Sequence, residues 1–194
     1  MCFGSQMIPA GYLLKRTTRP PEWLAAPDVI DICSLSRCVN DDVVDIERGW
    51  KHNSFGVAND PELLWRLVRE SNVDTAGAQL FYYEAYEQEI DSDDLQERPL
   101  RWRPLTQVPS GNVEPSFART PVNMVLMGYD VVVFGDYLEH SPLSCNSVAE
   151  SLLVNSHCLF STLDQAKEAL EAGHFNNCEP GVYKIYSVHL VPTT

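Results

Sequence analysis

The chain has 194 residues and a formal net charge of −13, from 14 Lys and Arg against 27 Asp and Glu. Its 44% hydrophobic and 10% aromatic content is typical of a globular protein rather than a disordered one. Because surfaces that bind phosphate backbones or anionic lipids need clustered cations, this charge argues against nucleic acids and membranes as partners.

The lack of a recognisable targeting signal and the spacing of the cysteines favour a cytoplasmic protein. No stretch approaches the roughly 18 to 20 apolar residues that span a bilayer. The cations near the start, Lys15, Arg16 and Arg19, follow the mildly apolar part, which reverses the order of a secretory signal. No C-x-x-C pair occurs, so we expect reduced thiols at all six cysteines: Cys2, Cys33, Cys38, Cys145, Cys158 and Cys178.

The first part of the chain predicts an extended lead-in over residues 1–27. Pro20 and Pro21 disfavour a helix there. Residues 28–33 are rich in β-branched side chains and predict the first strand.

A helix and a second strand complete a first β-loop-α-β unit, which we place at residues 28–98. Asp60 is a suitable helix N-cap, and Pro61 suits the first turn because its missing N–H has no partner there. The aromatic-rich segment 78–86 predicts a buried strand. Four apolar residues fall on one face of the helix: Leu63, Leu64, Leu67 and Val68.

Residues 99–121 contain five prolines and predict a connection without regular structure. After it, residues 124–134 form a buried-strand pattern, and residues 182–191 predict a final strand. Ser161 and Asp164 have capping-box spacing for a helix that ends at Gly173. Residues 122–194 therefore predict a second β-loop-α-β unit.

The two units keep the same order of elements at an offset of 102 residues. The overlay pairs residues 28–30 with 130–132, and Asn53 with Asn155. The sequence thus predicts an α+β fold of two similar β-loop-α-β units, a possible internal duplication, in one compact two-lobed sheet-and-helix protein. The alternative is two unrelated α+β halves.

Two loops contain Ser, Cys and Asn close together, around Cys38 and around Cys145. One interpretation is a small hydrolase or transferase with Cys145 as nucleophile and His157 as base. The other is that these are turn residues, with Ser and Asn bonding the local backbone. Cys2 offers a third possibility, an N-terminal nucleophile exposed by removal of Met1.

Cofactor motifs are absent from the sequence. Neither G-x-G-x-x-G nor a Walker lysine loop occurs, so no nucleotide cofactor is expected. No zinc spacing occurs either, and we expect no metal, which would require several of these residues to converge: Cys38, Cys145, His157, Cys158 and Cys178.

The acidic residues form two clusters. Residues 84–97 carry seven carboxylates with no cation between them, and residues 41–47 carry four. The plain interpretation is a solvated face that favours solubility. The sharper one is a surface that binds a basic protein site, with neighbouring aromatics Tyr82, Tyr86 or Trp102 as anchors. The candidate partner-binding residues are Asp41, Asp42, Asp45, Glu47, Glu84, Glu87, Glu89, Asp91, Asp93, Asp94 and Trp102.

Together these features favour a non-catalytic, acidic protein-binding module. The most concrete form is an immunity or antitoxin type inhibitor that neutralises a toxin enzyme with a basic active site. The small Cys145/His157 enzyme is the alternative, and the oligomeric state is left open.

Overall fold

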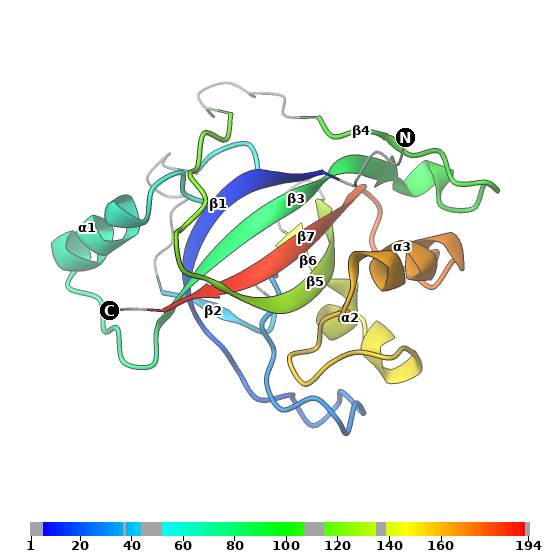
Figure 1. Ribbon diagram of the computed structural model, residues 1–194. Coiled ribbons are helices and arrows are strands. Elements are labelled where there is room, and N and C mark those ends of the chain that lie inside the picture. Colours follow the sequence, from blue (N-terminus) through cyan, green and yellow to red (C-terminus); the bar gives the residue numbers. More distant parts are fainter. Residues whose placement is uncertain (1–5, 37, 44–51, 107–114, 135–138, 193–194) are drawn as a thin grey trace.

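One antiparallel sheet of seven strands organises the chain, with the order β2-β1-β3-β7-β5-β6 and with β4 paired to β3 (Figure 1). This computed structural model describes all residues except 1–5, 37, 44–51, 107–114, 135–138 and 193–194. The strands are β1 Met7–Arg16, β2 Asp41–Asp42, β3 Gln79–Asp91, β4 Arg103–Pro104, β5 Val125–Phe134, β6 Glu139–His140 and β7 Val182–Val191. The helices are α1 Pro61–Ser71, η2 Ser92–Asp94, α2 Pro142–Cys145, η3 Val148–Ser151 and α3 Leu163–Glu171.

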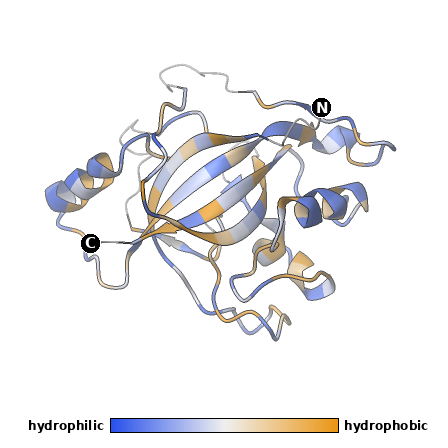
Figure 2. Cartoon of the chain, in the orientation of Figure 1, coloured by the Kyte–Doolittle hydropathy of each residue, from blue (hydrophilic) through white to orange (hydrophobic). Residues whose placement is uncertain are grey.

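The four long strands lie side by side, with α1 at one end of the sheet and α3 at the other (Figure 1). Apolar residues are buried on both faces of the sheet, since successive side chains of a strand point in opposite directions. Tyr183 and Ile185 of β7 pack in one cluster with α3, whereas Tyr186 and Val188 pack in a second cluster with Phe55. Figure 2 accordingly shows hydrophobic residues along the central strands.

Both long helices begin with a side-chain cap. Asp60 caps α1 by accepting a hydrogen bond from the Glu62 backbone N–H at 2.9 Å, as predicted. At α3 the capping box consists of Thr162 and Gln165, one residue later than the predicted pair Ser161 and Asp164. The helices are amphipathic, and their hydrophilic residues are visible in Figure 2.

The structure confirms the predicted strands at β3, β5 and β7, but the prediction of a strand at 28–33 is wrong. The first long strand is β1, inside the segment expected to be only a lead-in. In the segment 28–33, the N–H groups of Ile30 and Asp31 donate instead to the carbonyl of Ser156. One continuous sheet therefore contains β1 and β3 from the first part of the chain and β5 and β7 from the second.

The first strands of the two units share an unusual bend. β1 has a register shift at Gly11 and β5 has one at Gly128, and both glycines have φ of +148°. A Cβ atom at either glycine would lie closer than 3.0 Å to a backbone carbonyl oxygen, that of Ala58 or that of Phe160. The sheet therefore requires glycine at these two positions.

A loop held by one asparagine precedes each long helix. The side-chain oxygen of Asn53 accepts from the Phe55 N–H, and that of Asn155 accepts from the His157 N–H, both at 2.9 Å. Each asparagine Nδ2 donates at 2.7 Å to the carbonyl of the residue before the bulge glycine. The offset of 102 thus holds for these loops, but it does not pair residues 28–30 with a strand.

The Pro-rich connection is not wholly irregular, because β4 pairs with β3 through Arg103 and Pro104. Residues 107–114 of this connection lie outside the described part of the chain. No helix among the described residues combines the length and the apolar character needed to cross a bilayer.

Candidate functional site

A cavity of about 440 Å³ lies where β3, β4, β5 and β7 meet. Its walls combine charged, hydroxyl and apolar side chains. The lining residues are Ser54, Glu89, Arg103, Thr106, Phe134, Val182 and Lys184.

The charged centre of the cavity is the carboxylate of Glu89, which is only 2% exposed. Strand register positions its partners, because Glu89 of β3 lies opposite Arg103 of β4 on one side and opposite Lys184 of β7 on the other. Arg103 Nε donates to Glu89 Oε1 at 3.2 Å, and Lys184 Nζ lies 3.7 Å from Glu89 Oε2. Arg103 also donates to Asp91 Oδ2 at 3.3 Å.

Lys184 has an unusual environment for an amine. Its Nζ lies 4.6 Å from the ring centroid of Phe134 and 5.6 Å from that of Phe55. Burial lowers the pKa of Lys184, and Glu89 opposes this effect by favouring the charged ammonium. The cavity therefore holds an ammonium group that is largely removed from water and is paired with a buried carboxylate.

Three buried oxygen atoms in and beside the cavity have no hydrogen-bond partner within the described chain: Ser54 Oγ, Glu89 Oε2 and the hydroxyl of Tyr186. Tyr186 packs against Phe55 and Phe134, with ring centroids 6.2 and 6.0 Å away. Buried polar atoms of folded proteins are nearly always hydrogen-bonded. Ser54 and Glu89 line the cavity, so their oxygens are placed to bond a bound molecule, whereas Tyr186 is fully buried behind the lining.

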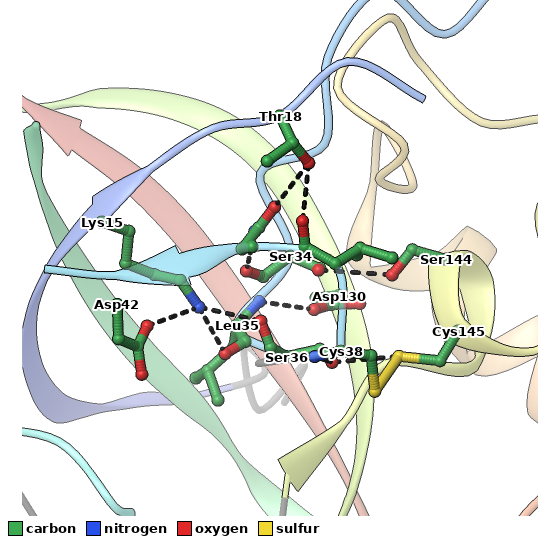
Figure 3. A network of polar contacts seen from close by, with 12 residues as sticks. Lys15, Thr18, Ser34, Leu35, Ser36, Cys38, Asp42, Asp130, Ser144 and Cys145 are labelled. Carbon is green, nitrogen blue, oxygen red and sulfur yellow. Dashed lines mark hydrogen bonds and ion pairs between the residues drawn. A yellow bond between two sulfur atoms is a disulfide. The ribbon is translucent and has the colours of Figure 1, made fainter. Parts of the chain in front are cut away.

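A second polar network joins the segment 34–36 to the sheet (Figure 3). Lys15 Nζ is buried, donates to the carbonyls of Leu35 and Ser36 at 2.8 and 2.9 Å, and pairs with Asp42 at 3.0 Å. A lysine is rarely this buried unless its charge is matched. Because all these contacts hold one covering loop, we interpret this network as structural.

Asp130 completes the same network from β5 (Figure 3). Its carboxylate accepts hydrogen bonds from Ser141 Oγ at 2.6 Å and from the Leu35 N–H at 2.9 Å. Burial raises the pKa of Asp130 to about 6, and these hydrogen bonds and Lys15 limit the rise. The carboxylate is inaccessible, so its role is to hold two loops rather than to meet a ligand.

The predicted acidic surface is only partly on the surface. Glu89 lies inside the cavity, and Asp42 pairs with Lys15. Glu84 lies 3.5 Å from His189 Nε2, and its hydrogen bond with this histidine lowers the pKa of Glu84. Basic side chains from other strands thus pair with several of these carboxylates, so the acidic residues do not form one continuous acidic surface.

The remaining acidic residues have mixed surroundings. Asp93 is exposed, whereas Asp91 pairs with Arg103 and accepts a hydrogen bond from the Asp93 N–H. Glu87 and Asp94 are half-buried, and Asp41 forms β2 with Asp42. Asp45 and Glu47 lie outside the described residues.

The expected aromatic anchors are not free on the surface. Tyr82 and Tyr86 are buried in the sheet. Trp102 is half-buried, packs edge-on against Tyr86 with centroids 5.8 Å apart, and lies 5.9 Å from Lys167 Nζ. These rings support the fold and leave little area to contact a partner.

The structure does not bring Cys145 and His157 into contact. Cys145 forms a disulfide with Cys38, which corrects the expectation of reduced thiols at all cysteines. His157 Nδ1 instead lies 2.6 Å from Asp31 Oδ1, and Cys33 donates to the same oxygen at 3.6 Å. Burial raises the pKa of the Cys33 thiol, so this second cluster does not present a thiolate.

The sequence patterns did not identify Arg103 and Lys184, the cations of the cavity. They also did not identify Lys15 and Asp130, the buried charges of the second polar network. One signal was available, because Lys15, Asp130 and Lys184 each interrupt an apolar strand pattern. A charge at such a position is buried with a partner. The identity of each partner depends on strand register, which one sequence does not reveal.

Comparisons of this chain with family models, with curated proteins and with solved structures give no match.

Proposed function

We propose that the protein binds a small molecule that carries an oxyanion together with a hydroxyl or amine, in the cavity around Glu89 and Lys184. The observation that carries this proposal is the buried Glu89–Lys184 pair, with Ser54 and Tyr186 hydroxyls unpartnered beside it in the described chain.

The chemistry of the walls defines the ligand. Arg103 and Lys184 are donors suited to a carboxylate or a phosphate. Glu89 Oε2, which lies 3.7 Å from Lys184 Nζ and has no partner at hydrogen-bond distance among the described residues, would accept a hydrogen bond from a hydroxyl or an amine of the same molecule. Phe134 and Val182 add apolar contact, and a volume of about 440 Å³ lies in the range of small-molecule sites.

A ligand screen tests this proposal. Libraries of small carboxylates and of phosphates are screened separately by ligand-observed NMR, so that the two kinds of oxyanion are distinguished. We expect a binder whose affinity falls about tenfold or more in Arg103→Gln and Lys184→Met, because each removes a charge-assisted hydrogen bond.

Arg101→Gln is the matched control, since Arg101 is exposed and pairs with Glu97 away from the cavity lining. Binding that is equally weakened by Arg101→Gln, or unchanged in Arg103→Gln and Lys184→Met, would contradict the proposal.

The acidic protein-binding module is a second proposal. Asp93 of the short helix η2 and Glu97, three residues after this helix, are both exposed. They are suited to contact a basic site of a toxin-like enzyme. The double substitution Asp93→Lys with Glu97→Lys should then abolish retention of a partner that wild type retains from the host lysate, and retention unaffected by this change or by salt would refute it.

Two further proposals concern origin and location. We propose that the units arose by duplication, supported by the matching glycine bulges and asparagine loops. We also propose a cytoplasmic location, supported by the scattered spacing of the six cysteines. In that compartment Cys38 and Cys145 would be held reduced for part of the time.

A further inference from the structure

Three potential metal ligands converge outside the cavity: Cys38, His140 of β6 and Cys145 of α2. Their ligand atoms all lie within 4.8 Å of one another, although Cys38 is far from the other two in sequence. His140 Nδ1 is 2.9 Å from Cys38 Sγ, and Ser36 Oγ is 3.0 Å from Cys145 Sγ. Cys38 is exposed, so the cluster is open to solvent.

We propose that these three side chains bind a zinc ion when the Cys38–Cys145 disulfide is reduced, with a water molecule in the fourth position. Two thiolates and one imidazole are ligands that zinc favours, and three protein ligands plus water is a known tetrahedral arrangement.

Zinc binding requires only a small movement of the Cys38 and Cys145 side chains. In tetrahedral zinc sites with Zn–S bonds of about 2.3 Å, the two sulfur atoms lie about 3.8 Å apart. The Cα atoms of Cys38 and Cys145 are 6.0 Å apart, which leaves room for both sulfurs to move apart by rotation about Cα–Cβ. His140 Nδ1 already faces Cys38 Sγ.

The protein passes from the disulfide form to the zinc form by reduction followed by metal binding. A thiol reductant breaks the S–S bond, and two electrons and two protons yield two thiols while the reductant forms its own disulfide. Zinc binding then releases both thiol protons to solvent, and neutral His140 contributes the lone pair of Nδ1. Ser36 donates a hydrogen bond to the Cys145 thiolate and so positions this ligand.

The cluster of Asp31, Cys33 and His157 is a weaker site for zinc. It contains one thiol, which is buried and donates to Asp31, and His157 already pairs with Asp31. It serves as the internal comparison in the test.

The test uses the full chain, reduced with a phosphine and titrated with Co²⁺ and then with Zn²⁺. We expect one tetrahedral Co²⁺ per chain, with thiolate-to-cobalt absorption that Zn²⁺ abolishes by displacement. His140→Ala and Cys38→Ser should weaken this binding about tenfold or more, whereas His157→Ala and Cys178→Ser should leave it unchanged. Oxidised protein should show no such absorption.

X-ray absorption of the zinc-loaded wild type avoids any dependence on variants that fail to fold, and should show two sulfur ligands and one imidazole. The proposal is overturned if reduced wild type binds no more cobalt than Cys38→Ser with Cys145→Ser. It is also overturned if His157→Ala, rather than His140→Ala, removes the signal, or if absorption shows a single sulfur ligand.

Discussion

Charged side chains inside apolar strands are the most informative single residues of this protein. Lys15, Asp130 and Lys184 are each buried in a long strand, and each has an oppositely charged group or several hydrogen bonds around it. Breaking such an arrangement is costly, because it leaves an uncompensated charge out of water. The pKa values of Asp130 and Lys184 therefore report directly on the surrounding structure.

Asp130 should make stability depend on pH. Its pKa is about 6 in the folded protein against an ordinary value of 3.8, so the folded state binds the proton more tightly. Relative to Asp130→Asn, wild type should gain roughly 3 kcal/mol of unfolding free energy as the pH falls from above 6 to below 4. Urea melts of both proteins across this range measure the gain, and a difference that stays constant would contradict it.

Lys184 should respond in opposite directions to its two charged neighbours. Glu89 raises the pKa of Lys184, and Arg103 lowers it. We therefore expect Glu89→Gln to lower this pKa further and Arg103→Gln to raise it. Carbon-detected NMR of the lysine side chains measures both shifts, with Lys184→Met to assign the signal and Arg101→Gln as the control that leaves it unchanged.

At the scale of elements, most of the regular structure is encoded locally. The helices and the strands β3, β5 and β7 follow from capping residues and apolar patterns that one sequence displays. β1 was missed because it is buried on both faces, contains Gly11 and ends near the buried Lys15, so that neither alternation nor continuous apolarity marks it. Segment 28–33 has the composition of a strand, but within it Ile32 forms an isolated bridge to Thr18 instead of a strand ladder.

The glycine bulges should be much less tolerant of substitution than a turn glycine. Gly11→Ala and Gly128→Ala add a Cβ closer than 3.0 Å to a backbone oxygen at φ of +148°. Gly77 also has positive φ, but nothing lies within 4 Å of its Cβ position, so Gly77→Ala should cost only about 1 kcal/mol of backbone strain.

Chemical denaturation of the three variants provides the comparison. Each bulge substitution should cost at least about twice as much unfolding free energy as Gly77→Ala. Equal losses for all three would show that the neighbouring loops move away easily.

At the scale of the whole molecule, contacts between residues that are far apart in sequence hold the parts of the fold together. The Cys38–Cys145 disulfide spans 107 residues and fixes the loop that covers Lys15 and Asp130 to α2 (Figure 3). The Glu89 cavity is likewise assembled from strands distant along the chain.

Reduction of this disulfide should destabilise the protein by about 2 to 4 kcal/mol, because a long loop of the unfolded chain is released. Guanidinium melts with and without a phosphine reductant, in the presence of a chelator, measure the difference. In Cys38→Ser the reductant should have no effect, and a reductant effect of the same size there would contradict the assignment to this bond.

The sequence by itself determined the acidic balance, both amphipathic helices, three of the four long strands and the α+β class. These depend on composition, caps and local periodicity, which neighbouring residues display. Only the tertiary structure decided that Glu89 is a buried ion-pair partner rather than part of an acidic surface, and that Cys145 meets Cys38 rather than His157. It also decided that a cavity with charged and apolar walls lies where β3, β4, β5 and β7 meet. The physical reason is that burial and pairing depend on strand register and on loops that cross the sheet, and these bring together residues whose separation in sequence carries no local signal.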